Sequence, residues 1–358
     1  MHRRLRCAGR ARARRGAACL PRSGPRRRHR LARGRLIGDQ RAHTVSQQVG
    51  LLFVVLFGLL GAATIAAFTR TFRDASPERT ALQERLAREL RALWVGLLLF
   101  WIAWASGPAV STVLFGFISF FALREFVTLT HTRRADHRSL LLAFFAILPL
   151  QYVLVATRQF NAFTVFIPVY VFFALPVISA LANDPFRFLE RTAKIQWGIT
   201  VCVYGMSHAP ALLLLDPPNY QGRGAFLVLF LVLVVVAAQL GQEVASRRLR
   251  RRPVSRAISR SFSWRAFGCG AAAAGAVGVL LFWATPFKPL PALAMAAVAG
   301  AAGTLGDFVM KALKRDAGVR TWLGGSSVTG ALGLLDRVAP LCFAAPVFFH
   351  SVRWYFGI

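Results

Sequence analysis

The sequence predicts an all-α fold, a polytopic integral membrane bundle of about nine to ten transmembrane helices. Of its 358 residues, 56% are hydrophobic and only 16% are charged. The apolar residues gather in blocks of about 15 to 22, the length that a hydrocarbon core of ~30 Å requires. These blocks are continuous, as in LVLFLVLVVVAAQL at 227–240. A membrane β-barrel would instead alternate apolar and polar residues, so a helical bundle is favoured.

A series of apolar segments accounts for the helices in chain order. The second and third segments form a tight hairpin, because Gly107-Pro108 separates them and both residues favour a turn. The predicted segments are 49–68, 92–106, 108–128, 139–156, 162–182, 195–215, 224–243, 266–285, 289–306 and 332–352.

An arginine-rich head precedes the first segment. Residues 1–44 carry fifteen arginines and a single acid, Asp39. This composition cannot bury a core, so we expect the head to be disordered. Val45, an alternative start, lies immediately before the first segment, which leaves open that residues 1–44 are not translated. Residues 45–358 are expected to form a single transmembrane domain.

The distribution of charge indicates how the bundle is oriented. Strict alternation of the segments places one set of loops on a common side: 69–91, 129–138, 183–194, 244–265 and 307–331. These loops hold nearly all the arginine and lysine outside the head, and basic loops stay in the cytoplasm. We therefore expect an integral protein of the bacterial inner (cytoplasmic) membrane. The net charge of +31 reflects this topology, so no nucleic-acid partner is expected.

The stretch 306–337 gathers acids, bases and glycines between two apolar segments. If it begins as a helix, one face carries, at i, i+4, i+7, i+8 and i+11, Asp307, Lys311, Lys314, Arg315 and Gly318. Asp336-Arg337 then opens the last segment. An acid at a membrane edge is costly without a cation or metal partner, so both acids are functional candidates. A purely structural alternative pairs Asp307 with Lys311, and Asp336 with a nearby arginine.

This stretch resembles the C-terminal signature of the phosphatidate cytidylyltransferase (CDP-diacylglycerol synthase) family. The matching positions are Gly306-Asp307, Lys314-Arg315, Asp336-Arg337 and one glycine of a pair, Gly333. Other signature positions are replaced: the family's Lys-Asp pair falls on Arg320-Thr321, its His falls near Ala331, and its final Asp falls on Ala339. The resemblance covers most of 50–358 and identifies the chain as a divergent member, with a catalytic-like region at 239–340.

A second motif lies in the loop 244–265, which has eight arginines and no acid. The arginines suit both a topology anchor on anionic headgroups and a site for substrate phosphate, and the two roles are compatible. Ser259, Ser263 and Trp264 resemble a Ser-Pro-Asn-Lys-Thr-Trp-Glu-Gly motif of the same family. The family's Lys falls on Phe262 and its Glu on Arg265. The resemblance implies that Ser259, Ser263 and Trp264 line the nucleotide or headgroup cleft.

The resemblance also implies an activity. The family joins CTP and phosphatidate into CDP-diacylglycerol and pyrophosphate, a step of phospholipid biosynthesis. It implies Asp307 and Asp336 as ligands of Mg2+, with Lys314, Arg315 and Arg337 holding phosphates. The implied partners are CTP, phosphatidate or a related lipid phosphate, and the lipid bilayer. The sequence leaves a homodimer open.

The replaced signature positions support a second hypothesis of a different class. A catalytically inactive relative would keep the fold and bind lipid phosphate, or act as a scaffold for another lipid-synthesis enzyme. CTP- and magnesium-dependent release of pyrophosphate by the purified protein separates the two hypotheses. In the fold, the transferase hypothesis requires Asp307, Asp336 and Lys314 to converge on one cleft that faces the cytoplasm.

Overall fold

The computed structural model describes residues 105–318 and 333–358 apart from 131, 219, 221, 250–251 and 260, together with parts of 50–102. All of these residues belong to one compact unit, Val49–Ile358. The head predicted at 1–44 and the signature positions at 320–331 lie outside the described residues.

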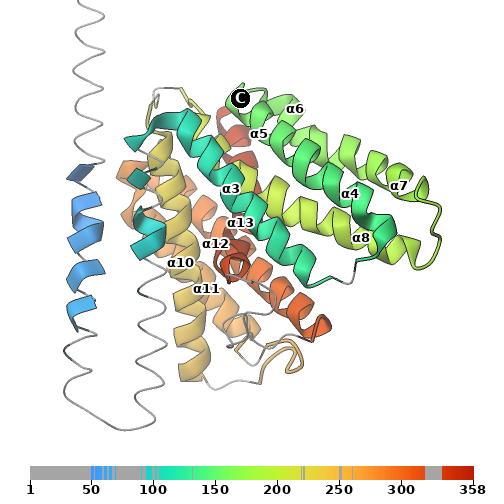
Figure 1. Ribbon diagram of the computed structural model, residues 1–358. Helices are drawn as coiled ribbons and strands as arrows, with labels where there is room; N and C mark the ends of the chain where they lie inside the picture. The colour runs from blue at the N-terminus through green and yellow to red at the C-terminus, as the bar shows by residue number, and fades with distance from the viewer. Residues whose placement is uncertain are drawn as a thin grey trace, which may run out of the picture. The chain divides into compact units, whose positions relative to one another are not determined.

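The described chain is built from helices and contains no strand, which confirms the predicted all-α class (Figure 1). Further helical residues lie within 50–69 and 90–105. The elements are α3 Gly107–Thr128, η1 Arg134–Asp136, α4 His137–Leu142, η2 Ala143–Ile147, α5 Leu148–Ala156, α6 Phe160–Val165, η3 Phe166–Val171, α7 Phe172–Ala180, α8 Phe188–Gly198, η4 Ile199–Gly205, α9 Met206–Leu214, α10 Gly224–Leu249, α11 Trp264–Leu280, η5 Phe282–Ala284, α12 Pro289–Asp316 and α13 Leu334–Phe356.

Six helices of the described chain are long and apolar enough to cross a membrane. They are Gly107–Thr128, Arg134–Ala156, Phe160–Ala180, Phe188–Leu214, Gly224–Leu249 and Pro289–Asp316. Each coincides with a predicted apolar segment. The shorter α11 and the C-terminal α13 occupy two further predicted segments. Large apolar side chains such as Phe145 and Phe173 are exposed on the outside, as a lipid-facing surface requires. The structure therefore confirms the predicted membrane bundle.

Several helices continue past the apolar segments that predicted them. α12 was expected to end at 306 and runs to Asp316, α10 continues from 243 to Leu249, and α8 begins at Phe188 rather than 195. An acid and a base four residues apart lie in each extension or where it begins, a spacing that stabilises a helix in water. The pairs are Asp307–Lys311, Glu243–Arg247 and Glu190–Lys194. With 28 residues, α12 spans about 42 Å, longer than a hydrocarbon core of about 30 Å.

α10, α11 and α12 approach one another closely because small residues line their contacts. A Cβ added at Gly300 of α12 would lie 2.5 Å from the Cβ of Ala274 in α11 and 3.0 Å from that of Ala238 in α10. Small residues let helix backbones come together in a membrane, where packing rather than hydrophobicity drives association. This packing places α12, which carries Asp307, against its neighbours.

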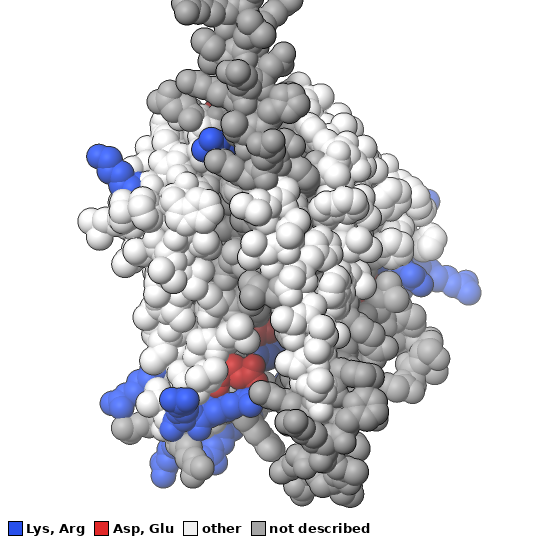
Figure 2. Space-filling view, turned by 90° about the vertical axis from the view of Figure 1, so that its left-hand side faces the viewer, with Lys and Arg blue, Asp and Glu red and all other residues white. Residues whose placement is uncertain are grey.

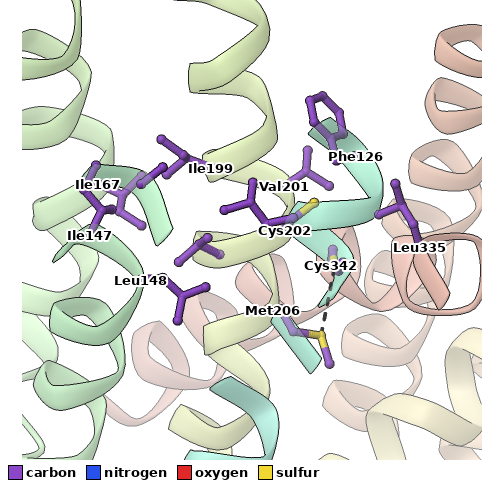
Figure 3. Packing of buried hydrophobic residues seen from close by; sticks show 14 of the residues in the cluster. Phe126, Ile147, Leu148, Ile167, Ile199, Val201, Cys202, Met206, Leu335 and Cys342 are labelled. Atoms are coloured by element: carbon purple, nitrogen blue, oxygen red, sulfur yellow. Dashed lines mark hydrogen bonds between the residues drawn. The ribbon is translucent and has the colours of Figure 1, made fainter. Parts of the chain in front are cut away.

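A buried apolar core joins α3, the helix formed by α8, η4 and α9, and α13 (Figure 3). Phe126, Cys202, Met206, Leu335 and Cys342 belong to it. The Sγ of Cys342 lies 3.9 Å from the Sδ of Met206. Because Leu335 lies in the first turn of α13, this core anchors the start of the helix that carries Asp336.

The polar ends of these helices gather on one side of the bundle. α3, α10 and α12 end, and α11 and α13 begin, toward the lower side of Figure 1. In Figure 2, lysine and arginine side chains cluster at this lower end beside acidic ones, while the surface above is mostly neither basic nor acidic. The candidate functional residues therefore lie among the basic loops, as the alternation of the segments predicted.

Candidate functional site

One ion pair joins α12 to α13, and a second lies within α12 beside it. Lys314 of α12 binds Asp336 of α13, and Lys311 binds Asp307 one turn along α12. Asp336 is also within electrostatic range of Asp307 and Lys311. The four side chains, Asp307, Lys311, Lys314 and Asp336, therefore form a single acid–lysine cluster.

The acid–lysine cluster lies between the packed interior and the surface. The side chains of Asp307 and Asp336 are 29% and 33% exposed, whereas that of Lys314 is only 13% exposed. Partly buried charges attract one another more strongly than charges on the surface, because less water surrounds them. Removing one partner of such a pair therefore lowers the stability of the protein more than removing a surface partner does. A ligand can reach the carboxylates, and the lysines already balance their charge.

The spacing predicted for the start of the stretch 306–337 is observed, because α12 remains helical through Asp316. Asp307, Lys311 and Lys314 follow one another along α12. The pairing of Asp307 with Lys311 is the one that the structural alternative predicted. Arg315 and Arg337 are exposed close to the cluster in sequence, on α12 and α13 respectively. Their role in phosphate binding stays a prediction.

A third acid, Glu125 of α3, lies beside the cluster. Its side chain is buried, and its Oε2 accepts hydrogen bonds from the backbone N–H groups of Leu334, at 3.0 Å, and Leu335, at 3.2 Å. The carboxylates of Glu125 and Asp336 are close enough to repel one another electrostatically. Glu125 is absent from the site residues predicted from the sequence, although an acid inside the apolar segment 108–128 is itself a signal of a functional residue.

The start of α13 collects negative charge. Asp336 is the third residue of this helix and Glu125 binds its first two N–H groups. The N-terminus of a helix carries about half a positive charge and stabilises nearby anions. Gly333, which precedes α13, has φ +69 and offers no side chain to cap the helix. The carboxylate of Glu125 takes the place of the missing cap.

The loop before α11 docks on α12 next to Asp307. Phe262 is 3% exposed, and its ring packs on that of Phe308 with the ring centres 4.4 Å apart. Phe262 is the residue that the resemblance places on the family's Lys, and in the structure it makes an apolar contact. The contact places the loop 252–263 beside the turn of α12 that carries Asp307.

The three predicted cleft residues of this loop have different surroundings. Ser263 is buried, and its Oγ accepts a hydrogen bond of 3.2 Å from the N–H of Ala266, which makes it the N-cap of α11. Ser259 is buried and its Oγ lies 3.2 Å from that of Ser261. Trp264 is 65% exposed, so its indole is available to a ligand or to lipid.

An open pocket of about 420 Å³ lies at the other end of the bundle. It is lined by Arg158, Gln159, Phe160, Asn161, Ala162 and Arg353. Its arginines are already engaged, since Arg158 binds Asp216 and Arg353 donates to Asn161 and to the backbone carbonyl of Ile358. None of the predicted site residues lines this pocket.

Known proteins resemble this chain over most of its length. A family profile described as "Cytidylyltransferase family" matches residues 86–355. A protein of Escherichia coli (strain K12) named "Uncharacterized protein YnbB" is 35% identical over 306 residues, which make up 84% of this chain and 96% of that protein. The range matched by the profile contains the acid–lysine cluster, Glu125 and the loop 252–263.

Proposed function

The chain belongs to the cytidylyltransferase family, and from this premise we propose that it transfers a cytidylyl group from CTP to phosphatidate or a closely related lipid phosphate. The products are CDP-diacylglycerol and pyrophosphate, which places the reaction in phospholipid biosynthesis. The observation that carries the proposal is the acid–lysine cluster, in which Lys314 and Asp336 join two membrane helices. A phosphoryl-transfer site in a membrane needs this combination of carboxylates and cations.

The reaction exchanges one phosphorus–oxygen bond for another. An oxygen of the lipid phosphate attacks the α-phosphorus of CTP, a new P–O bond forms, and the bond to the β-phosphate oxygen breaks. The leaving pyrophosphate takes the bonding electron pair. Because an anion attacks a polyanion, the site must neutralise charge and hold the two substrates in line. Lys311 and Lys314 supply positive charge within the cluster, and Arg315 and Arg337 supply it at the surface.

Mg2+ is the cofactor that we propose, with Asp307 and Asp336 as its protein ligands. The donor set fits, since Mg2+ prefers oxygen and binds through one or two carboxylates together with substrate phosphate. The buried Oε1 of Glu125 has no hydrogen-bond partner among the described residues, and a nearby cation or its water would satisfy such an atom. When bound, Mg2+ neutralises charge on the leaving pyrophosphate.

The loop 252–263 is the part of the site that we assign to the nucleotide or the lipid headgroup. It is docked beside Asp307 through Phe262 and Phe308, and its exposed arginines, Arg252 and Arg256, can bind phosphate. Ser263 does not bind substrate in this proposal. Its hydroxyl oxygen caps α11 and so fixes where the loop joins the helix. Trp264 offers an exposed ring next to the cap. We place this end of the bundle in the cytoplasm, where CTP is available.

Purified protein in phosphatidate-containing nanodiscs tests the proposal. CTP and Mg2+ should together yield pyrophosphate and CDP-diacylglycerol in equal amounts, and omitting either should stop the reaction. Asp336→Asn should lower the rate by at least about 100-fold, because it removes both a metal ligand and the partner of Lys314. Asp216→Asn, which removes an acid at the opposite end, is the matched control and should react at the wild-type rate.

Two results would contradict the proposal. Unaltered turnover by Asp336→Asn would remove the site assignment. Absence of any cytidylyl transfer by well-folded protein that still binds phosphatidate would instead support the inactive, lipid-phosphate-binding relative.

A further inference from the structure

Glu125 connects α3 to the first turn of α13 over a long stretch of chain. Its Oε2 accepts the N–H of Leu334 at 3.0 Å and that of Leu335 at 3.2 Å, 209 and 210 residues further along. The backbone N–H of Gly333 also interacts with the carboxylate of Glu125 as a hydrogen-bond donor. Glu125 is 4% exposed, so these charge-assisted hydrogen bonds form where water does not compete with them.

The register of α13 depends on this contact. A helix leaves its first N–H groups unsatisfied, and a side chain at the N-cap usually accepts them. Here the N-cap is Gly333, which has no side chain and adopts the left-handed conformation. The capping oxygen comes from another helix, so the position of the first turn of α13 is set relative to α3.

Asp336 follows this turn directly. The apolar neighbours on both sides of the contact, Phe126 beside Glu125 and Leu335 beside Asp336, lie in the same buried core (Figure 3). The side chain of Leu335 anchors the turn in the core while its N–H binds Glu125. Asp336 is then presented to Lys314 on α12.

We propose that Glu125 is a positioning residue that holds the first turn of α13 so that Asp336 meets Lys314 and the site behind the proposed transferase reaction is formed. This inference rests on the proposed function for its catalytic consequence but not for its structural content.

The hydrogen bonds of Glu125 also have a consequence for substrate binding. A helix N-terminus is an anion-binding site, and at α13 Glu125 already occupies two of its N–H groups. These two N–H groups are therefore closed to substrate phosphate, and we assign its binding to the lysines and arginines of the site.

Cross-linking by a short bismaleimide measures the position of α13 without any reference to activity. Cysteines introduced as Lys314→Cys and Asp336→Cys, in a background with the native cysteines replaced, should be joined rapidly by this reagent, because it spans the combined length of the lysine and aspartate side chains that are in contact here. Glu125→Leu removes the capping oxygens and should slow this cross-linking by about tenfold. Glu125→Gln keeps an acceptor oxygen of the same reach and should retain most of the wild-type rate.

The control is Ser119→Ala on the same helix. Ser119 is fully buried and donates a hydrogen bond to the carbonyl oxygen of Cys202 rather than to α13. Its replacement disturbs the packing of α3 at a comparable depth and should leave cross-linking between positions 314 and 336 at the wild-type rate. Equal slowing in Ser119→Ala and Glu125→Leu would overturn the proposal, as would wild-type cross-linking in Glu125→Leu.

Kinetics test the catalytic consequence. Glu125→Leu should raise the Mg2+ concentration for half-maximal pyrophosphate release by about 10- to 100-fold, a typical effect of losing a group that orients a metal ligand. Combining it with Asp336→Asn should add no further loss, because Glu125 acts through Asp336. Additive losses would overturn the proposal. If the wild type transfers no cytidylyl group, the proposed function fails while cross-linking still decides the role of Glu125.

Discussion

Lys314 is the residue on which the link between α12 and α13 depends at the proposed site. Its side chain is 13% exposed, and its ammonium binds the carboxylate of Asp336 on the neighbouring helix. Lys311 makes the corresponding contact with Asp307 within one helix and is 40% exposed. Two lysines one turn apart therefore differ in burial and in what they connect, so they should differ in their contribution to stability.

We expect Lys314→Met to destabilise the protein by about 1 to 3 kcal/mol, because it leaves a partly buried carboxylate without its ammonium partner. Lys311→Met should cost only about 0 to 1 kcal/mol, as is typical of exposed pairs within one helix. Unfolding in detergent, followed by circular dichroism, measures both. Equal losses for the two variants would show that burial does not distinguish the pairs.

Phe262 shows a different kind of change at a single residue. The resemblance places it on a lysine of the family's motif, and in the structure its ring packs on that of Phe308. This apolar contact holds the loop against α12. The positive charge beside the two acids comes from Lys311, which binds Asp307, and Lys314, which binds Asp336.

At the scale of the elements, α12 combines two kinds of helix. Its first part is rich in alanine and glycine and packs closely against α10 and α11, and its last three turns carry the charges of the site. The position of Asp307 and Lys314 therefore depends on how closely the first part packs. A side chain at Gly300 would separate α12 from Ala274 and Ala238.

Gly300→Val should lower stability by about 1 to 3 kcal/mol, since overpacking a close helix contact forces backbones apart. The same change at Gly268 of α11, where an added Cβ meets no atom within 4 Å, is the matched control. Gly268→Val should remain close to wild type in thermal unfolding and in yield. If Gly300→Val were as stable as the wild type, α12 would be able to shift without loss of stability.

Loops between the membrane helices are connected by a second charge network. Arg191 of α8 is 7% exposed and binds Asp184 at 2.7 Å and Asp136 at 3.0 Å. Asp184 also accepts the N–H of Phe186 at 3.1 Å. This backbone hydrogen bond, together with the guanidinium of Arg191, lowers the pKa of Asp184 below its ordinary value. The network ties the loop after α7 to the one before α4.

The lowered pKa predicts a dependence of stability on pH. An acid whose pKa is lower in the folded than in the unfolded state stabilises the protein above the unfolded pKa of about 4, and this contribution is lost as the pH falls toward the folded pKa. Thermal unfolding measured from about pH 6 down to about pH 3 should therefore show a smaller acid-induced decline in Asp184→Asn than in the wild type. Identical declines would exclude a contribution from Asp184.

At the scale of the whole molecule, charge is distributed unequally between the two ends of the bundle. The end that holds the site also holds the basic loops, whereas scattered charges lie at the other ends of the helices: Lys288 precedes α12, Arg158 follows α5 and Arg223 precedes α10. Loops rich in arginine and lysine remain in the cytoplasm during insertion. The whole bundle should therefore be oriented with its polar site toward CTP.

Cysteine labelling in intact cells measures this orientation. With the native cysteines replaced, Lys288→Cys, at the exposed start of α12, should react with a membrane-impermeant maleimide added outside. Arg256→Cys, exposed in the loop before α11, should react only after the membrane is permeabilised. The reverse pattern would show that the site faces away from the cytoplasm.

Much of the bundle could be predicted from hydropathy, and less of the site. Six predicted segments correspond to helices that can cross a membrane, but the ends of α8, α10 and α12 were placed too early or too late. Charged turns such as Asp307–Lys311 continue a helix beyond the apolar run, and hydropathy does not register them. Glu125 was missed because its role appears only when α3 meets α13.

The class of this protein and the position of its apolar segments follow from the sequence alone, and the sequence also offers Asp307 and Lys311 as a structural pair, because these features depend on residues within a few turns of one another. That Lys314 binds Asp336 and that Glu125 caps α13 becomes visible only in the folded protein. The reason is that contacts between helices depend on which faces pack, and in a membrane that choice is made by small residues and buried polar groups spread over the whole chain.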